Sequence, residues 1–588
     1  MRNRLVTIVF PLALTSVLLA GCAAVTSATG TDNASGTTST AIDVDATQTA
    51  EQVLAANATV HDTTDAATWD AADVVAVSLD GASATSSGDG VSVDGGVVTI
   101  TAAGTYELSG TLDDGQVVVN STGDGVVRLI LNGVDISSST GSAIEFTAAD
   151  DAVVVLADGS SNSLSDTDSY ADTADANAAL YSAADLTITG TGSLTVAGNG
   201  NDGITGKDGL VIESGDISVT AVDDGIRGKD YLVVTGGTIT VDAGGDALKS
   251  DNEDDADKGF VAISGGTLSL AAAGDGIQAQ TDVVITGGSI DVTSGGGNGT
   301  ALVTDVSSKG VKGDVIVVIS GGDLSVDAAD DAVHSNGGVH LSGGEVSLAT
   351  GDDAVHADTA LYIDGGAVTV STSVEGLESA SITIADGTVD VVSSDDGINA
   401  SGDAGQTVAV LISGGTTTID AEGDGFDSNG VASMTGGVLT VNGPTGSGNG
   451  ALDVDGEFTV SGGELLAVGS SGMVISPSTD SAQGWISSVL TTGVTAGDQV
   501  QILDASGTVV GMFTAAKSAQ SVVFSSTDIV TGDSYTVQVD GAEIGTATAG
   551  EAAAGQMGGG GMGGGGGGER PSGDAPSGDA PSGGGFSG

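Results

Sequence analysis

The sequence is poor in cysteine and in positive charge. Its 588 residues include one cysteine, Cys22, so no disulfide within the chain is available to stabilise a fold. Only 12 lysines and arginines stand against 79 acidic residues, which gives a net charge of −67. A surface this acidic repels nucleic acid and anionic lipid and excludes the usual basic-patch partners, but it attracts cations.

The N-terminus carries one apolar run, Leu5 to Leu19, that is too short for a typical membrane span. The run follows a positively charged start at Arg2 and Arg4 and ends in Leu19-Ala20-Gly21-Cys22. This ending resembles the lipobox of bacterial lipoproteins, which implies that residues 1–21 are a signal peptide and that Cys22 carries lipid. We therefore expect an exported protein, lipid-anchored to the cell membrane and facing the outside. The alternative is an ordinary secretory signal with a chance cysteine.

Two further segments lack a sustained apolar period. Residues 22–65 are rich in Ser, Thr, Ala and Asp and cannot bury enough surface to fold, which predicts a disordered tether. Residues 550–588 are Gly-rich and repeat Pro-Ser-Gly-Asp-Ala, which predicts a disordered tail. The folded part is expected between these two segments.

A Gly-Gly turn flanked by alternating apolar residues recurs along the chain, most often every 22 residues. The pairs are Gly236-Gly237, Gly265-Gly266, Gly287-Gly288, Gly321-Gly322, Gly343-Gly344, Gly365-Gly366, Gly414-Gly415, Gly436-Gly437 and Gly462-Gly463. Short β-branched stretches of period two separate the turns. Each coil buries its apolar residues only by stacking on its neighbours. The repeat therefore predicts an all-β fold, a right-handed parallel β-helix, rather than a β-sandwich.

The rhythm of the repeat divides the folded part into three. We expect regular coils over residues 186–475. Residues 66–185 are strand-rich but less repetitive, which predicts an N-terminal cap and irregular coils. Residues 476–549 break the phase and contain strand pairs, which predicts a small β cap closing the open core.

An acidic residue followed by Gly or Ala and then by an apolar residue keeps step with the coils. These residues, the acidic column, are Asp202, Asp224, Asp246, Asp275, Asp331, Asp353, Glu375, Asp396 and Asp424. Thr300 and Gly450 are expected at the equivalent place in two exceptional coils. Equivalent carboxylates in such a fold lie about 4.8 Å apart and repel each other. Either bridging calcium or the capping of turn amides by aspartate explains why the column exists.

The densest acidic cluster is the loop Asp251-Asn252-Glu253-Asp254-Asp255-Ala256-Asp257. Its spacing resembles the start of an EF-hand loop, but Ala256 replaces the required glycine. We expect Ca²⁺ as a cofactor of this part of the chain. The candidate ligands are Asp202, Asp224, Asp246, Asp251, Glu253, Asp255 and Asp275.

A second column of side chains follows three residues after the acidic one. Its members, the polar column, are Thr205, Arg227, Lys249, Gln278, His334, His356, Glu378, Asn399 and Asp427. Arg227 and Lys249 are expected to be neighbours, as are Lys207 and Lys229 two residues further on. His334 and His356 stay unassigned, because a metal site needs a third ligand that the sequence does not identify.

The chain from about Trp69 to Thr548 resembles a family of bacterial carbohydrate-binding β-helix proteins first recognised in a cellulose-degrading clostridium. The residues that carry the resemblance are Gly104 to Gly110, Leu131-Asn132-Gly133-Val134-Asp135-Ile136, Asp158 to Asp166 and the Gly-Asp-Gly-Ile coils. The resemblance implies a pectate-lyase-like fold that binds calcium, with Asp202, Asp224, Asp246 and Asp275 at the matching acidic positions. It also implies binding, rather than cleavage, of cellulose or acidic plant polysaccharides.

Aromatic residues make up only 3% of the chain, and the two tryptophans, Trp69 and Trp485, lie outside the regular coils. No row of stacking rings is visible, which favours polar or calcium-bridged recognition of an acidic, pectin-like glycan. The candidate glycan-binding residues are Lys207, Arg227, Lys229 and Lys249. The alternative is that these residues only offset the acidic column.

Three functions remain open. The first is a non-catalytic, calcium-assisted carbohydrate-binding surface lipoprotein, monomeric and without nucleic acid, for which no catalytic residue is assigned. The second is a calcium-dependent polysaccharide lyase with Arg227 or Lys249 as the base. The third is a structural surface adhesin or spacer whose calcium only stiffens the coils.

Overall fold

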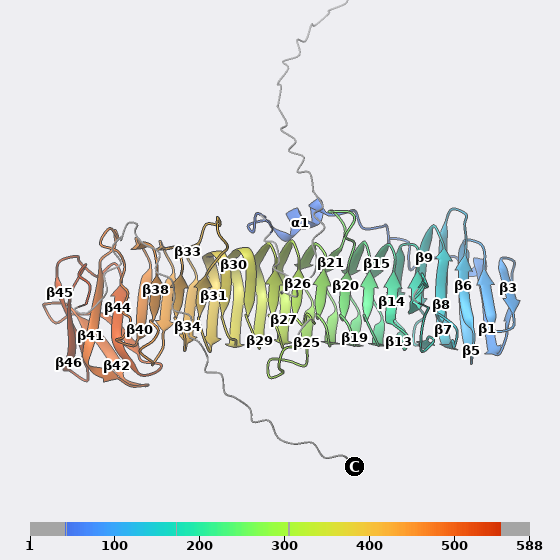
Figure 1. Cartoon of the computed structure of the whole chain (residues 1–588). Helices are drawn as coiled ribbons and strands as arrows, with labels where there is room; N and C mark the ends of the chain where they lie inside the picture. Colours follow the sequence, from blue (N-terminus) through green and yellow to red (C-terminus); the bar gives the residue numbers. More distant parts are fainter. Residues whose placement is uncertain (1–41, 43, 172, 304–305, 554–588) are drawn as a thin grey trace, which may run out of the picture. The chain divides into compact units, whose positions relative to one another are not determined.

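The computed structural model describes residues 42, 44–171, 173–303 and 306–553 of the chain. The chain divides into two units, of which the first, Met1–Thr40, lies outside the described residues together with Cys22 and the predicted signal peptide. The second unit is nearly all β and forms a parallel β-solenoid of about 15 coils (Figure 1), as the repeat predicted. In the part of the chain described, no helix is long and apolar enough to cross a membrane.

Three parallel ladders of strands run through the stacked coils. The first ladder carries the acidic column and the polar column and consists mainly of short strands. It comprises β4 (Val97–Ile100), β6 (Gln116–Asn120), β8 (Ile144–Ala148), β11 (Ala178–Ser182), β14 (Asp202–Gly206), β17 (Ile226–Gly228), β20 (Leu248–Ser250), β23 (Ile277–Ala279), β26 (Val311–Gly313), β28 (Val333–Ser335), the starts of β30 (Val355–Thr372) and β31 (Leu377–Ser393), β32 (Ile398–Ala400), β35 (Phe426–Ser428) and β38 (Leu452–Val454).

The second and third ladders complete each coil. The second comprises β9 (Asp151–Leu156), β12 (Leu186–Gly190), β15 (Gly209–Ile212), β18 (Tyr231–Val234), β21 (Phe260–Ile263), β24 (Asp282–Ile285), β33 (Ala409–Ile412), β36 (Val431–Met434) and β39 (Phe458–Val460). The third comprises β10 (Ser161–Ser165), β13 (Ser193–Gly198), β16 (Asp216–Ala221), β19 (Thr238–Ala243), β22 (Thr267–Ala272), β25 (Ser289–Ser294), β34 (Thr416–Ala421), β37 (Val438–Asn442) and β40 (Glu464–Gly469). In the middle coils β27 (Ile316–Ala328), β29 (Gly338–Thr350), β30 and β31 run through both ladders without a break.

The core is a continuous file of aliphatic side chains inside the coils. Strands of the third ladder alternate between exposed and buried residues; in β19, for example, Ile239, Val241 and Ala243 point inward. Equivalent residues stack in register from coil to coil, as Ile226 does on Leu248. Because the file fills a single cluster from Val77 to Val523, each coil depends on its neighbours for burial.

The Gly-Gly pairs form the corner between the second and third ladders, and each glycine has its own reason. A Cβ on the first glycine, Gly343, would lie 2.4 Å from the carbonyl oxygen of Ser320 in the preceding coil. The second glycine, Gly344, has a φ of +83°, which other residues rarely adopt. The corner therefore requires glycine twice, once for space and once for conformation.

The N-terminal coils are less regular, as the sequence indicated. They are built from β1 (Val74–Gly81), β5 (Gly104–Leu112) and β7 (Val126–Ser137), with β2 (Ala84–Ser86) and β3 (Val91–Asp94) paired antiparallel to β1 and β4. Strand β7 then feeds both the second and the third ladder, through β9 and β10.

Residues 44–65 differ from the disordered tether that was predicted there. They lie along the second ladder and include helix α1 (Ala50–Ala56), which begins with a capping box at Thr49. Val53 is buried in a small cluster with Val284 and Val318 of the second ladder. These small apolar residues show no clear period in the sequence, but together they fit a strip of the sheet, and this burial orders the segment. We call residues 44–65 the N-terminal strap.

A small β cap follows the last coil, at the red end of Figure 1. Strand β44 (Ala519–Ser525) pairs antiparallel with both β40 and β41 (Trp485–Val494). A separate four-stranded sheet follows the order β43 (Val509–Thr514), β42 (Gln499–Leu503), β45 (Ser534–Val539), β46 (Ala542–Thr548). The cap has its own apolar cluster and covers the edge of β40.

Candidate functional site

The acidic column and the polar column run side by side along the first ladder. Each acidic residue lies at the corner where the third ladder turns into the first, and each polar residue lies at the middle of the following short strand. The register places Thr205 opposite Arg227, Arg227 opposite Lys249, and His334 opposite His356. The spacing read from the sequence therefore places these side chains correctly.

One carboxylate oxygen of most residues in the acidic column caps the next coil. Asp246 Oδ1 accepts a hydrogen bond of 2.7 Å from the backbone amide of Asp275, the equivalent residue one coil further on. The same contact joins Asp224 to Asp246 at 3.0 Å and Asp424 to Gly450 at 2.6 Å. The column thus caps corner amides, which is one of the two explanations that the sequence left open.

The second carboxylate oxygen faces the polar column. Lys249 Nζ lies 2.8 Å from Asp246 Oδ2 and 3.1 Å from Asp224 Oδ2, so one ammonium group bridges two coils. Arg227 Nη1 lies 3.6 Å from Asp202 Oδ2. Burial raises the pKa of Asp224 to about 6, against the opposite effect of Lys249. The N-terminal half of the column is therefore neutralised by side chains of the protein itself.

The coil with the long insertion departs from the expectation. Ile277 pairs with Val311, so the position equivalent to Asp275 is Lys309 and not Thr300. The insertion lies before this position, and Lys309-Gly310-Val311 hides the acidic pattern because its first residue is basic. Lys309 Nζ lies 2.6 Å from Asp331 Oδ2. The basic residue at this position therefore forms an ion pair with the acidic residue of the next coil.

The predicted calcium ligands separate into two groups. Four of them, Asp202, Asp224, Asp246 and Asp275, form one file along the corner. In the loop, Asp251 forms a two-pronged ion pair with Arg227, Asp255 lies 3.4 Å from Lys258, and Glu253 is exposed. Asn252, which the sequence did not single out, orders the loop because its Oδ1 atom accepts hydrogen bonds from the backbone amides of residues 254 and 255. A calcium ion bound to Asp202, Asp224 or Asp246 would displace a guanidinium or ammonium group.

The predicted glycan-binding residues lie together on the first ladder and its border. Seven of the twelve basic residues in the chain fall within this stretch: Lys207, Arg227, Lys229, Lys249, Lys258, Lys309 and Lys312. Burial lowers the pKa of Arg227, but the hydrogen bond with Asp251 and the charges of the neighbouring carboxylates together raise the pKa overall. In Lys207, by contrast, burial and then the charge of Arg227 lower the pKa. The side chain of Lys229 is 35% exposed, and its Nζ atom lies 3.8 Å from Asp254 Oδ2.

The C-terminal half of the two columns has no such neutralisation. Among the described residues, no lysine or arginine lies within 4.0 Å of five carboxylates here: Glu375, Asp396, Asp424, Asp427 and Asp453. Burial, followed by the charges of Asp396 and Asp453, raises the pKa of Asp427 to about 7. These last coils thus carry a strip of carboxylates without basic partners.

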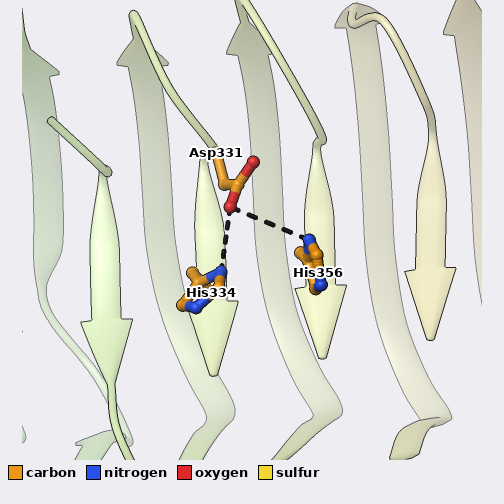
Figure 2. A group of neighbouring side chains, drawn as sticks. All are labelled: Asp331, His334 and His356. Atoms are coloured by element: carbon orange, nitrogen blue, oxygen red, sulfur yellow. Dashed lines mark hydrogen bonds and ion pairs between the residues drawn. The ribbon is translucent and has the colours of Figure 1, made fainter. Parts of the chain in front are cut away.

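The two histidines lie between these halves, and the structure supplies the acidic neighbours that the sequence did not identify. Figure 2 shows Asp331 directed toward His334 and His356 on adjacent strands. His356 Nδ1 also lies 3.0 Å from Asp353 Oδ2 and 3.3 Å from Glu378 Oε2. Two regularities in the sequence predict this grouping when they are combined. The acidic and polar columns are three residues apart within a coil, and equivalent residues stack on each other in adjacent coils.

Comparisons with known proteins identify the family. One family model, described as carbohydrate-binding domain-containing protein, matches residues 94–354 and 352–541. A protein of that description from Acetivibrio thermocellus is 40% identical over 137 residues, which are 23% of this chain and 48% of that protein. The solved structure of a polysaccharide lyase-like protein from C. thermocellum, a gadolinium derivative, shares 35% identity over 38% of this chain and 92% of its own, with a TM-score of 0.37. The match to the family model spans most of the coils and the cap, and the chain belongs to the family of carbohydrate-binding domain-containing proteins.

Proposed function

We propose that the protein binds an acidic, pectin-like polysaccharide without cleaving it, assisted by calcium. The observation that carries this proposal is the concentration of seven of twelve basic residues on the first ladder and its border, in a chain with a net charge of −67. Membership of the carbohydrate-binding family supplies the ligand class. The basic residues then supply the preference for a glycan that carries carboxylates.

A glycan would bind to this surface when its carboxylates replace protein carboxylates as the partners of the lysines. Lys229 and Lys207 border the first ladder, and Lys229 pairs with Asp254 only at 3.8 Å. A sugar carboxylate competes easily for an ammonium group in such an exposed pair, because the pair itself contributes little free energy. Arg227 is held by Asp251 and Asp202, so it serves to position the neighbouring charges. Lys207 and Lys229 are therefore the residues that should contact the glycan first.

Calcium has its clearest place in the C-terminal half of the columns. The carboxylates of Asp396, Asp424 and Asp427 have no basic partner within the described residues, and their mutual repulsion favours a bound cation. Calcium takes six to eight oxygen ligands at about 2.3–2.6 Å, including carboxylates of the protein and of a sugar. The ion would thus hold the glycan where the protein itself is negatively charged.

The test is binding of polygalacturonate to the unlipidated protein, in calcium and in chelator, while the ultraviolet absorbance of unsaturated sugar products is recorded. Saturable, calcium-dependent binding without new absorbance supports the proposal. Lys229→Gln should weaken binding about fivefold, since an exposed charge pair is worth up to about 1 kcal/mol. The matched control is Lys517→Gln, because Lys517 pairs with Asp420 and Glu422 away from the first ladder. Binding that persists unchanged in chelator would contradict the role of calcium.

One observation keeps a lyase as the second candidate. A lyase requires a base that is neutral near physiological pH. The charges of neighbouring carboxylates and hydrogen bonds to them raise the pKa of both Arg227 and Lys249 against the effect of burial. The lowered pKa of Lys207 makes that residue the better candidate. New absorbance that disappears in Lys207→Ala would establish the lyase. If the protein neither binds polygalacturonate nor produces new absorbance, the role of a structural spacer remains.

We also propose that lipid on Cys22 anchors the protein to the outer side of the cell membrane. The motif Leu19-Ala20-Gly21-Cys22 supports this, and it lies outside the residues that the structure describes. Metabolic labelling with a fatty acid, followed by mass spectrometry of the N-terminal peptide, tests it. Label that remains in Cys22→Ser would contradict the anchor.

A further inference from the structure

Two carboxylates from two adjacent coils converge at His356. Its Nδ1 atom lies 3.0 Å from Asp353 Oδ2 and 3.3 Å from Glu378 Oε2. Asp353 comes from the acidic column of the same coil, and Glu378 follows His356 in the polar column. The register of the ladder fixes all three positions, so the cluster is a product of the fold and not of a flexible loop.

The separations match those between ligands of one metal ion. Nitrogen and oxygen ligands at about 2.0–2.2 Å from a metal, with angles between square and tetrahedral, lie about 3.0–3.4 Å from one another. Both distances at His356 Nδ1 fall in this range. The second ring nitrogen, Nε2, lies 3.3 Å from Asp358 Oδ1. Histidine ligands of metals commonly have such a carboxylate on the outer nitrogen, which fixes the ring orientation.

The neighbouring group of Asp331, His334 and His356 is a weaker candidate. Asp331 Oδ2 already faces the ammonium group of Lys309 at 2.6 Å, and His334 Nδ1 at 2.9 Å. His356 Nδ1 lies 3.9 Å from the same oxygen. A cation at this place would have to displace Lys309, whereas no lysine or arginine within the described residues lies within 4.0 Å of Asp353 or Glu378.

We propose that Asp353, His356 and Glu378 bind a first-row transition-metal ion, with Zn²⁺ as the probe. Imidazole suits zinc, copper or nickel and disfavours calcium, so this site is distinct from the proposed calcium strip. The side chains of His356 and Glu378 are 26% and 21% exposed, which leaves access for the ion and for a further ligand. Three protein ligands leave at least one position for water or for a hydroxyl group of a bound glycan.

Equilibrium dialysis of Zn²⁺ against the protein tests this, in excess Ca²⁺ to saturate the acidic surface. One tight site is expected in the wild type. Loss of a ligand in His356→Gln or Glu378→Gln should weaken it at least about 100-fold, since loss of an outer partner alone costs about 10- to 100-fold. Asp358→Asn should weaken it about tenfold for the same reason.

The matched control is His334→Asn, which alters the adjacent histidine and should leave the affinity within about twofold, because His334 is not a ligand of the proposed ion. Binding of Co²⁺ in place of Zn²⁺ gives a second readout, since the visible spectrum reports a nitrogen ligand and the coordination number. Circular dichroism confirms that each variant is folded. Zinc affinity equal in wild type and His356→Gln, or lost equally in His334→Asn, would overturn the assignment.

Discussion

At the scale of single residues, the aspartates in the N-terminal half of the acidic column have two tasks, one for each oxygen. Asp246 Oδ1 caps the next coil through the amide of Asp275, and Asp246 Oδ2 meets Lys249. The side chain thus links neighbouring coils through the backbone and neighbouring columns through charge. A residue that only offset charge, or only capped a turn, would not need both contacts.

Asp246→Ala removes both contacts and should destabilise the coils by about 1–3 kcal/mol, because the amide of Asp275 loses its acceptor. Asp246→Asn keeps an acceptor oxygen and should cost less. Hydrogen exchange at the amide of Asp275 measures the effect locally. Equal exchange rates in wild type and Asp246→Ala would contradict the capping role.

Asp282 provides a dependence on pH that does not involve the proposed ions. Burial raises its pKa to about 6, against hydrogen bonds from Asn57 and the backbone of Ile316. The folded state therefore binds this proton more tightly than the unfolded state does, and the free energy of unfolding should rise as the pH falls from 7 toward 4. Asp282→Asn should be more stable than the wild type at pH 7, by thermal melting, and the difference should vanish near pH 4.

The sequence located these residues better than it located their partners. The step of 22 residues placed Arg227 beside Lys249, because a ladder fixes the register between coils. It did not reveal that Asp353 and Glu378 flank His356, because that contact combines two different steps. Partners in three dimensions become visible in a repeat only when both columns are compared at once.

At the scale of elements, the corner between the second and third ladders limits what each coil tolerates. Gly343 is limited by the carbonyl of Ser320, and Gly344 by its positive φ. Coil length is not limited in this way. The insertion of residues 295–308 leaves Ile277 in register with Val311, so loops lengthen at a corner without shifting the ladders.

Gly344→Ala should destabilise the fold by about 1–2 kcal/mol, because alanine is strained in the left-handed region. Gly343→Ala should do at least the same, because a Cβ at 2.4 Å from the Ser320 oxygen forces adjacent coils apart. Gly446→Ala is the control, since nothing lies within 4 Å of its added Cβ. Thermal melting compares the three; a loss in the control equal to that in Gly343→Ala would contradict the corner argument.

The N-terminal strap shows where composition alone misleads. Residues 22–65 look uniformly polar and small, yet Val53 is 2% exposed and packs on the second ladder. The long insertion misled in another way, because Lys309 replaced the acidic residue that marked every neighbouring coil. In both cases the structure depends on contacts with another segment of the chain, which the local sequence pattern does not reveal.

Val53→Ser should release α1 from the sheet, since burial of a valine side chain contributes about 1.5–3 kcal/mol. Leu54 is the matched control on the same helix because it is 37% exposed, so Leu54→Ser should have little effect. Hydrogen exchange over residues 50–56 reports the release. Unchanged exchange in Val53→Ser would show that other contacts hold the strap.

At the scale of the whole molecule, a stack of parallel coils has two open ends that invite further strands. The C-terminal end is closed by β44, which pairs antiparallel with β40 and brings its own apolar cluster. An uncovered β40 would offer unpaired backbone groups to a second copy of the chain. The cap is therefore the element that ends the stack.

Truncation after residue 475 should convert the protein into oligomers, because it exposes the edge of β40 and the end of the core. Light scattering after size-exclusion chromatography measures the mass. Truncation after residue 553 is the control, since it keeps β46 and the rest of the cap. A monomer in both truncations would show that the edge of β40 is protected without the cap.

The capping aspartates also make the coils interchangeable. Most coils offer one acceptor oxygen at the same corner and present one amide at the equivalent corner, as Asp224, Asp246 and Asp275 do in succession. Any coil with these two features can follow any other. Duplication of a 22-residue unit would therefore extend the surface by one step of about 4.8 Å without altering the joints on either side. The length of the solenoid therefore depends on its number of repeats, which gene duplication changes in whole steps.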